Sequence, residues 1–152
     1  MYFDTAYIAK FYLNEPDSAA VRAIIKKAPT LRCSAWALVE LQCVFHRNMR
    51  EGHITEAHAN ELATVFSEHV TMGLWRLIPV TEALLRRTGA LVAAAPATVF
   101  LRSGDALHLV SALEAGEHEV WSNDRHLLAA APHFGLAGRT VPLERTEPAL
   151  VG

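Results

Sequence analysis

Short apolar runs alternate along this chain with longer stretches in which apolar and polar residues recur at helical spacing. Ile8, Phe11 and Tyr12 show that spacing, because residues three and four apart lie on one face of a helix. Apolar runs too short for a helix predict strands at residues 1–4, 31–34, 75–80, 120–122 and 138–143. The stretches between them predict helices at residues 5–14, 18–28, 34–50, 55–72, 81–95, 104–114 and 125–131.

Capping residues and helix breakers support these boundaries. Ser34, Thr81 and Ser103 each precede an amphipathic stretch and suit the N-cap, where a hydroxyl oxygen accepts from a free backbone N–H. Pro29 ends the second helix, because proline lacks the N–H that a helix interior requires. Gly52 suits the residue just past a helix end, where a left-handed backbone is common.

The predicted strands and helices alternate, with a pair of helices inserted between the second and third strands. Short apolar strands joined by helices are typical of a mostly parallel sheet covered on both faces. We therefore expect an α/β fold in which two helical layers enclose about five short strands. The 152 residues suffice for one domain. We assign residues 1–145 to that domain and residues 146–152 to a flexible tail.

The composition excludes several classes of protein. A hydrophobic fraction of 51% argues against disorder and leaves apolar surface for a dimer or a bound partner. The formal net charge of -2 gives no overall basic field, so nucleic-acid binding would need a local patch. Cys33 and Cys43, without a C-x-x-C pair, argue against a disulfide framework or a zinc ribbon. We find no leader peptide and no membrane-spanning run, and expect a cytoplasmic protein.

Carboxylates occur at four places where an unpaired charge is unfavourable. Asp4 ends the first predicted strand, Asp124 lies two residues after the fourth, Glu40 lies between Val39 and Leu41, and Asp105 begins an apolar helix. Each has a structural alternative: Asp4 and Asp124 suit N-caps, and Asp105 suits the first turn of a helix. Glu40 needs a positive partner, which could be Arg47 or a metal ion.

A site is expected where the strands end, because parallel sheets bind ligands beyond the carboxyl ends of their strands. One divalent cation there would compensate all four carboxylates, and without it some of their pKa values should be raised. His108 lies three residues after Asp105, on a neighbouring part of the same helix face, and is either a participant or a structural histidine. The hydroxyl of Thr5 and the polar groups of Ser122 and Asn123 could orient ligands or water around a metal.

These separate signals combine into a recognisable pattern. The chain resembles the PIN-domain family, and most closely the toxin component of VapBC toxin–antitoxin modules. The resemblance is carried by residues 2–16, 34–40, 101–109 and 122–127, of which Leu101–Leu109 is the most specific match. It extends over roughly residues 1–143, and no acidic position is missing. Ser122 stands where the family usually has threonine.

The resemblance implies a PIN-like three-layer α/β/α sandwich and a Mg²⁺-dependent endoribonuclease, with Mn²⁺ as a substitute metal. Asp4, Glu40, Asp105 and Asp124 carry over as the catalytic and metal-binding cluster. Of these, Asp4 and Asp105 are expected to bind the metal directly, and Glu40 and Asp124 directly or through water. Mg²⁺ prefers oxygen ligands and keeps several waters, so that a few carboxylates suffice.

The resemblance also implies partners. RNA would be the substrate, and a small antitoxin would bind the toxin, which would itself form a homodimer. The cations nearest the acidic motifs in the sequence are candidates for holding RNA phosphates: Lys10, Arg47, Arg102 and Arg125. Solvation, or pairing with the carboxylates, is the structural alternative for each of them.

Three other functions deserve comparison with the ribonuclease. A PIN-fold binding module without activity is disfavoured by the intact acidic set. A receiver-type phosphoacceptor domain would have adjacent acidic residues near the first strand and a lysine on the last strand, and neither is present. A phosphatase of the DxD type would have a second aspartate at position 6, where this chain has Ala6.

Overall fold

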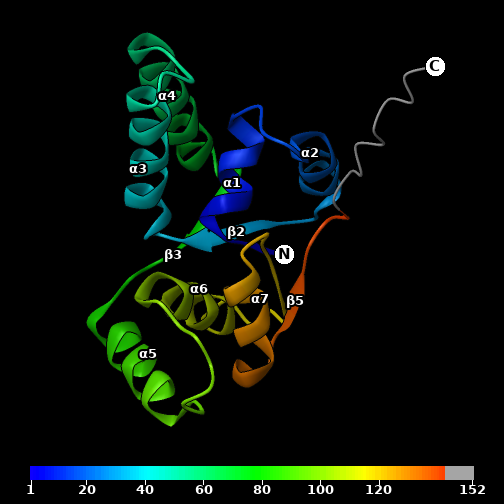
Figure 1. The fold of residues 1–152 in the computed structure, drawn as a ribbon, viewed down its shortest axis with the longest axis vertical. Helices are drawn as coiled ribbons and strands as arrows, with labels where there is room; N and C mark the ends of the chain where they lie inside the picture. The colour runs from blue at the N-terminus through cyan, green and yellow to red at the C-terminus, as the bar shows by residue number, and fades with distance from the viewer. Residues whose placement is uncertain (143–152) are drawn as a thin grey trace, which may run out of the picture.

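A five-stranded parallel sheet lies between two layers of helices in the computed structural model, which describes residues 1–142 (Figure 1). Its order is β3-β2-β1-β4-β5. The strands are β1 (Tyr2–Phe3), β2 (Leu31–Ser34), β3 (Trp75–Ile78), β4 (Glu119–Trp121) and β5 (Ala137–Arg139). The prediction of a mostly parallel α/β fold with about five short strands is confirmed. The last strand is shorter than predicted, and Leu143 and the expected tail 146–152 lie outside the described residues.

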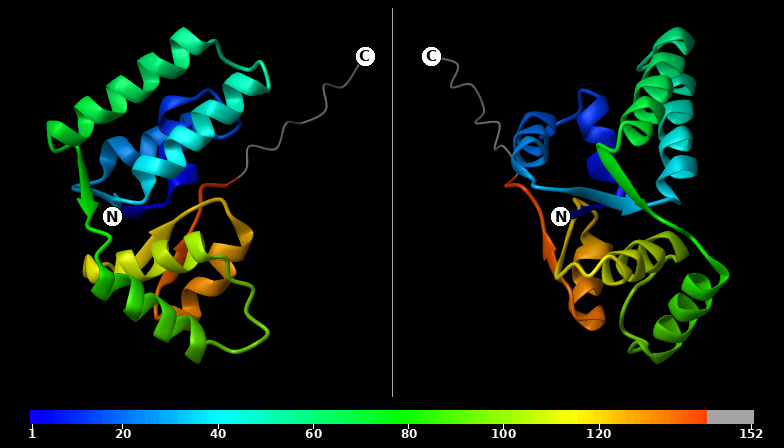
Figure 2. Two further views of the ribbon diagram at one scale, coloured as in Figure 1. Left: turned by 90° about the vertical axis from the view of Figure 1, so that its left-hand side faces the viewer. Right: turned by 180° about the vertical axis from the view of Figure 1, so that it is seen from behind.

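Seven α-helices in the described residues cover the two faces of the sheet. α1 to α4 lie on one face and α5 to α7 on the other (Figures 1 and 2). Their bounds are α1 (Thr5–Tyr12), α2 (Ser18–Lys27), α3 (Ala37–Arg50), α4 (Glu56–Thr71), α5 (Glu82–Ala94), α6 (Ser103–Glu114) and α7 (Arg125–Ala130), with a short 3₁₀ helix at Ala131–Phe134. No helix among residues 1–142 combines the length and the apolar character needed to cross a membrane.

The two residues of β1 belong to different hydrophobic cores. Consecutive side chains of a strand point to opposite faces of the sheet. Phe3 is therefore buried with Tyr7 and Trp75 beneath α1 to α4, whereas Tyr2 is buried with Leu109 beneath α5 to α7. This central two-residue strand thus joins both layers and fixes the position of the residue that follows it, Asp4.

Helix α3 differs from the prediction at its start and in its buried face. It begins at Ala37, and the Ser34 hydroxyl instead accepts from the backbone N–H of Trp36 (3.2 Å) in the turn before it. Only a narrow stripe at four-residue spacing, Ala37, Leu41 and Phe45, is buried. The apolar residues on either side of Glu40 are not all covered, since Val39 is 52% exposed. Glu40 therefore lies at the border of the core rather than within it.

The strand order produces a crevice beside β1. From β1 the chain builds outward through β2 and β3, and then returns to add β4 and β5 on the other side. The connections after β1 and β4 therefore leave the sheet in opposite directions at neighbouring strands, which is where ligand sites form in parallel sheets. Phe3 pairs with Trp121, so Asp4 and Ser122 follow these strands side by side.

Candidate active site

All four carboxylates expected to form the site line one cavity of about 630 Å³. Asp4 directly follows β1, and Asp124 follows β4 at the start of α7. Glu40 reaches the cavity from the first turn of α3, and Asp105 from the first turn of α6. Four elements that are distant in the sequence therefore each contribute one carboxylate at the carboxyl end of the sheet.

Asp4 is both a helix cap and a buried charge. Its Oδ1 accepts from the backbone N–H of Tyr7 (3.0 Å), and its Oδ2 accepts from the Ser122 hydroxyl. Burial raises the pKa of Asp4 to about 6, although the charge of His108 and these two hydrogen bonds oppose the rise. Asp4 meets the expectation of a raised carboxylate pKa, and the main cause of the rise is desolvation rather than repulsion between carboxylates.

Glu40 is held by the side chains of Thr5 and His108. The Thr5 hydroxyl and the Nε2–H of His108 both donate to its Oε2, at 2.5 and 2.6 Å. Burial raises the pKa of Glu40, but the hydrogen bond and charge of His108 outweigh it, so the pKa is lowered. The sequence suggested Arg47 or a metal ion as the partner of Glu40, and in the structure that partner is His108.

His108 is buried and uses both ring nitrogens. Its Nδ1 lies 2.9 Å from the Tyr2 hydroxyl, while Nε2 faces Glu40. An ionised carboxylate can only accept, so Nε2 carries the proton, and in the neutral ring Nδ1 accepts from Tyr2. The chain Tyr2–His108–Glu40 thus fixes the direction of the Glu40 carboxylate from inside the core.

Arg102 connects the remaining two carboxylates. Its Nε and one terminal nitrogen donate to Asp105 (2.8 and 3.1 Å), and the same terminal nitrogen donates to Asp124. Arg102, rather than the expected Ser103, is also the N-cap residue of α6. Burial raises the pKa of Asp124, but hydrogen bonds from the backbone N–H of His126 and from Arg102 outweigh it, so the pKa is lowered.

The donor set suits a hard divalent cation, because all four groups offer carboxylate oxygens, the ligand type that Mg²⁺ and Mn²⁺ prefer. The buried charge of Asp4, disfavoured without a cation, supports the same conclusion. Within residues 1–142, however, no three acidic, histidine or cysteine side chains are already grouped as a ligand set. The guanidinium of Arg102 accounts for this at Asp105 and Asp124, since it occupies the carboxylate oxygens that a metal would use.

The predicted RNA-binding cations are placed very differently. Arg47 and Arg102 line the cavity, whereas Arg125 lies outside its lining at the start of α7. Lys10 is buried, donates to the carbonyl of Pro16 (2.6 Å) and lies 3.5 Å from Glu15. The structure therefore does not bring Lys10 to the carboxylates, because its charge is used to close the turn between α1 and α2.

The predicted accessory groups take distinct positions. Thr5 and Asn123 line the cavity, whereas Ser122 is buried behind it, where its hydroxyl also accepts from the backbone N–H of Asp124 (2.9 Å). Ser122 therefore connects Asp4 to Asp124. His108, which the sequence left open between participant and structural histidine, lines the cavity and hydrogen-bonds Glu40.

Two residues of the site were missed from the sequence. Tyr2 was counted only as a strand residue, although a phenol in a buried strand must find a hydrogen-bond partner. Gly104 approaches Glu40 so closely that a Cβ there would lie 3.0 Å from Oε1. A glycine in the first turn of a helix, just before an acidic residue, was the available signal for such an approach.

Comparisons with known proteins identify the family and the fold of the chain. A family model described as the PIN domain matches residues 1–132, whereas no curated protein matches the chain. One similar solved structure is VapC20 of Mycobacterium tuberculosis, a toxin that cleaves the sarcin–ricin loop. It matches with a TM-score of 0.66 and 17% sequence identity, and the match covers 85% of this chain and 93% of VapC20. Another is VapBC2 of Rickettsia felis bound to a DNA fragment from its promoter, with 14% identity and a TM-score of 0.64, over 92% of this chain and 98% of that one.

Proposed function

The chain belongs to the PIN-domain family, and from this membership we propose that it is a metal-dependent endoribonuclease that acts as the toxin of a type II toxin–antitoxin module. The observation that carries the proposal is the meeting of Asp4, Glu40, Asp105 and Asp124 in one cavity at the carboxyl ends of β1 and β4. The two similar toxin structures support the toxin role.

The residues of the cavity divide the work of RNA hydrolysis. A divalent cation held by these carboxylates would polarise the scissile phosphate and help to ionise a water molecule. We propose Asp4 and Asp105 as direct ligands of Mg²⁺ or Mn²⁺, with Glu40 and Asp124 binding directly or through water. Ser122 and His108 hold Asp4 and Glu40 in place. Arg47, which lines the cavity, is suited to bind an RNA phosphate.

The partners in this proposal are an RNA substrate, a cognate antitoxin and a second copy of the chain. One of the similar structures is a VapBC assembly, which supports the antitoxin. Exposed apolar side chains on α3 and α5, among them Val39 and Leu85, offer surface for a protein partner. An arginine of the antitoxin that binds Asp105 and Asp124 would take over the ion pairs that Arg102 now makes with them.

The test of this function is cleavage of a mixed pool of structured RNAs by the purified chain with Mg²⁺, with Mn²⁺ or with EDTA. Single-stranded and duplex DNA serve as substrate controls, and Glu40→Gln serves as the protein control. We expect the wild-type protein to cleave RNA only when a divalent metal is present, and we expect Glu40→Gln to lose this cleavage. If the folded, antitoxin-free protein binds RNA but leaves it intact with either metal, it is a binding module instead.

Arg102→Gln is expected to tighten Mn²⁺ binding. The guanidinium must leave Asp105 and Asp124 before a metal can bind to their oxygens. A half-exposed ion pair of this kind stabilises the protein by at most about 1 kcal/mol, so its removal should change the affinity for Mn²⁺ by roughly fivefold. Isothermal titration with Mn²⁺ measures the dissociation constant.

Arg47→Gln is the matched control for Arg102→Gln, because Arg47 lines the same cavity and has no ion pair with any residue between 1 and 142. It removes the same charge without freeing a carboxylate, and should tighten Mn²⁺ binding less. Weaker binding by Arg102→Gln would mean that Arg102 positions Asp105 for the metal, contrary to this account.

A further inference from the structure

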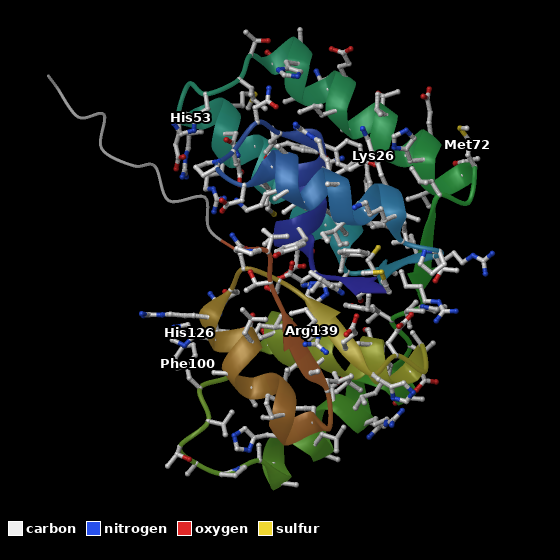
Figure 3. All side chains as sticks on the ribbon, turned by 90° about the vertical axis from the view of Figure 1, so that its right-hand side faces the viewer. Lys26, His53, Met72, Phe100, His126 and Arg139 are labelled. Carbon is white, nitrogen blue, oxygen red and sulfur yellow. The ribbon has the colours of Figure 1, made fainter. Side chains whose placement is uncertain are left out.

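An exposed aromatic pair lies next to the candidate active site but outside its cavity. Phe100, in the connection before α6, is 57% exposed, and its ring lies against the imidazole of His126 on α7 with centroids 4.3 Å apart and planes at 41°. Figure 3 shows the two side chains together at the surface. Because Phe100 is largely exposed, its ring is available for contact with a ligand.

The pair lies beside Asp124 of the candidate active site. The backbone N–H of His126 donates to Asp124 Oδ1 (2.8 Å). Phe100 lies two residues before Arg102 in the sequence, and the Arg102 guanidinium donates to Asp124 Oδ2. The aromatic pair is therefore close to a carboxylate of the site.

The pair borders a separate small cavity and a cation. The cavity, of about 300 Å³, is formed by Thr98, Val99, Phe100, His126, Ala129, Ala130 and His133. Its lining combines apolar side chains with the hydrogen-bonding groups of Thr98 and His133. Arg125 Nε donates to His126 Nε2 (3.4 Å), which places a guanidinium beside the imidazole. An exposed aromatic ring with a neighbouring cation and hydrogen-bonding groups is the combination that binds an unstacked nucleobase and its phosphate.

We infer that Phe100 and His126 form a stacking platform for one unpaired base of the RNA substrate, close to the bond that is cut. The inference rests on the proposed ribonuclease function and adds to it a substrate class: RNA with an unstacked base adjacent to the cleavage site. A protein surface would also cover Phe100, but the small cavity, the neighbouring guanidinium and the closeness of the pair to Asp124 favour a nucleotide. Arg125 then binds a phosphate of the same strand.

The experiment pairs a change in the protein with a change in the RNA. Steady-state cleavage is measured on the oligonucleotide that the wild-type protein cuts, and on versions with an abasic ribonucleotide at each position flanking the cut. Base stacking of this kind typically changes binding by about tenfold. We expect Phe100→Ala to lower kcat/KM about tenfold on the intact RNA, and Phe100→Trp to restore it.

The abasic RNAs identify the base. At one position, loss of the base should lower kcat/KM of the wild-type protein about tenfold and have no further effect on Phe100→Ala, because both changes remove the same contact. Met72→Ala is the matched control, since Met72 is an exposed apolar side chain at the far end of α4 (Figure 3) and should cleave as the wild type does.

Three results would overturn the inference. If Phe100→Ala cleaves every RNA as well as the wild type does, the platform does not exist although the ribonuclease does. The same holds if the variant loses only self-association, which would assign Phe100 to a protein interface. If the wild-type protein cleaves no RNA with any metal, the proposed function fails, and the inference fails with it.

Discussion

Asp4→Asn is expected to lower RNA cleavage by about a thousandfold, because metal catalysis supplies several kcal/mol of transition-state stabilisation and Asp4 is a proposed direct ligand. The loss should be specific to the chemistry. Asparagine keeps the oxygen that accepts from the N–H of Tyr7, so the cap of α1 is retained. Single-turnover cleavage at saturating Mg²⁺ measures the effect, and circular dichroism verifies the fold.

The same variant should be more stable than the wild type when metal is absent. The pKa of Asp4 is about 6 in the folded protein against 3.8 as its ordinary value, so the folded state binds the proton more tightly. The stability that this proton contributes is complete below pH 3.8 and is lost as the pH rises through about 6. At neutral pH the ionised carboxylate costs on the order of 3 kcal/mol, which asparagine avoids.

Urea unfolding in EDTA tests this stability difference. The advantage of Asp4→Asn should be small near pH 4, grow between pH 4 and 6, and reach its full size above pH 7. Saturating Mg²⁺ should reverse the order, because only the wild type gains full binding energy from the metal. If Asp4→Asn is less stable than the wild type at every pH, ionisation of Asp4 does not lower the free energy of unfolding. That result would contradict the conclusion that burial raises the pKa of Asp4.

His108→Leu is expected to weaken metal binding and cleavage by about ten- to a hundredfold, the usual effect of removing a group that orients a metal-binding side chain. Leucine removes the 2.6 Å hydrogen bond to Glu40, so that carboxylate keeps the hydrogen bond from Thr5 but its direction is less firmly fixed. The Mn²⁺ dissociation constant should rise, and more metal should be needed for cleavage. At saturating metal the loss of cleavage should be smaller than at low metal.

Two further variants separate positioning from packing. His108→Gln keeps an N–H donor toward Glu40 and should recover most of the metal affinity, whereas Tyr2→Phe removes only the 2.9 Å contact to Nδ1 and should have a smaller effect. If His108→Leu binds Mn²⁺ as tightly as the wild type, His108 is a structural histidine, and its contact with Glu40 is incidental.

Much of the fold follows from local patterns. Each short apolar run is bounded by residues that disfavour its continuation, and the helices between them carry caps such as Thr81, whose hydroxyl accepts from the N–H of Leu84 (3.1 Å). Strand order is different, because it depends on which strands pair across the whole chain. The position of β1 at the centre of the sheet, which brings Asp4 beside Ser122, was not evident from any local pattern.

The acidic residues could be predicted, but most of their partners could not. Arg102 and Asp105 are three residues apart on one helix end, so their ion pair is accessible to a local rule. The contact of His108 with Glu40 joins α6 to α3 and requires the packed structure. Lys10 was selected because it is close to Asp4 in the sequence, yet its ammonium group donates to the carbonyl of Pro16 and Lys10 is not among the residues that line the cavity.

The most direct test of the metal centre is an anomalous difference map from crystals of the chain soaked in Mn²⁺. The account predicts a Mn²⁺ peak bonded to Asp4 and Asp105, with the guanidinium of Arg102 displaced from Asp105 and Asp124, and no such peak in Asp4→Asn crystals. An empty cluster in protein that cleaves RNA with Mn²⁺, or a peak bound elsewhere, would contradict it.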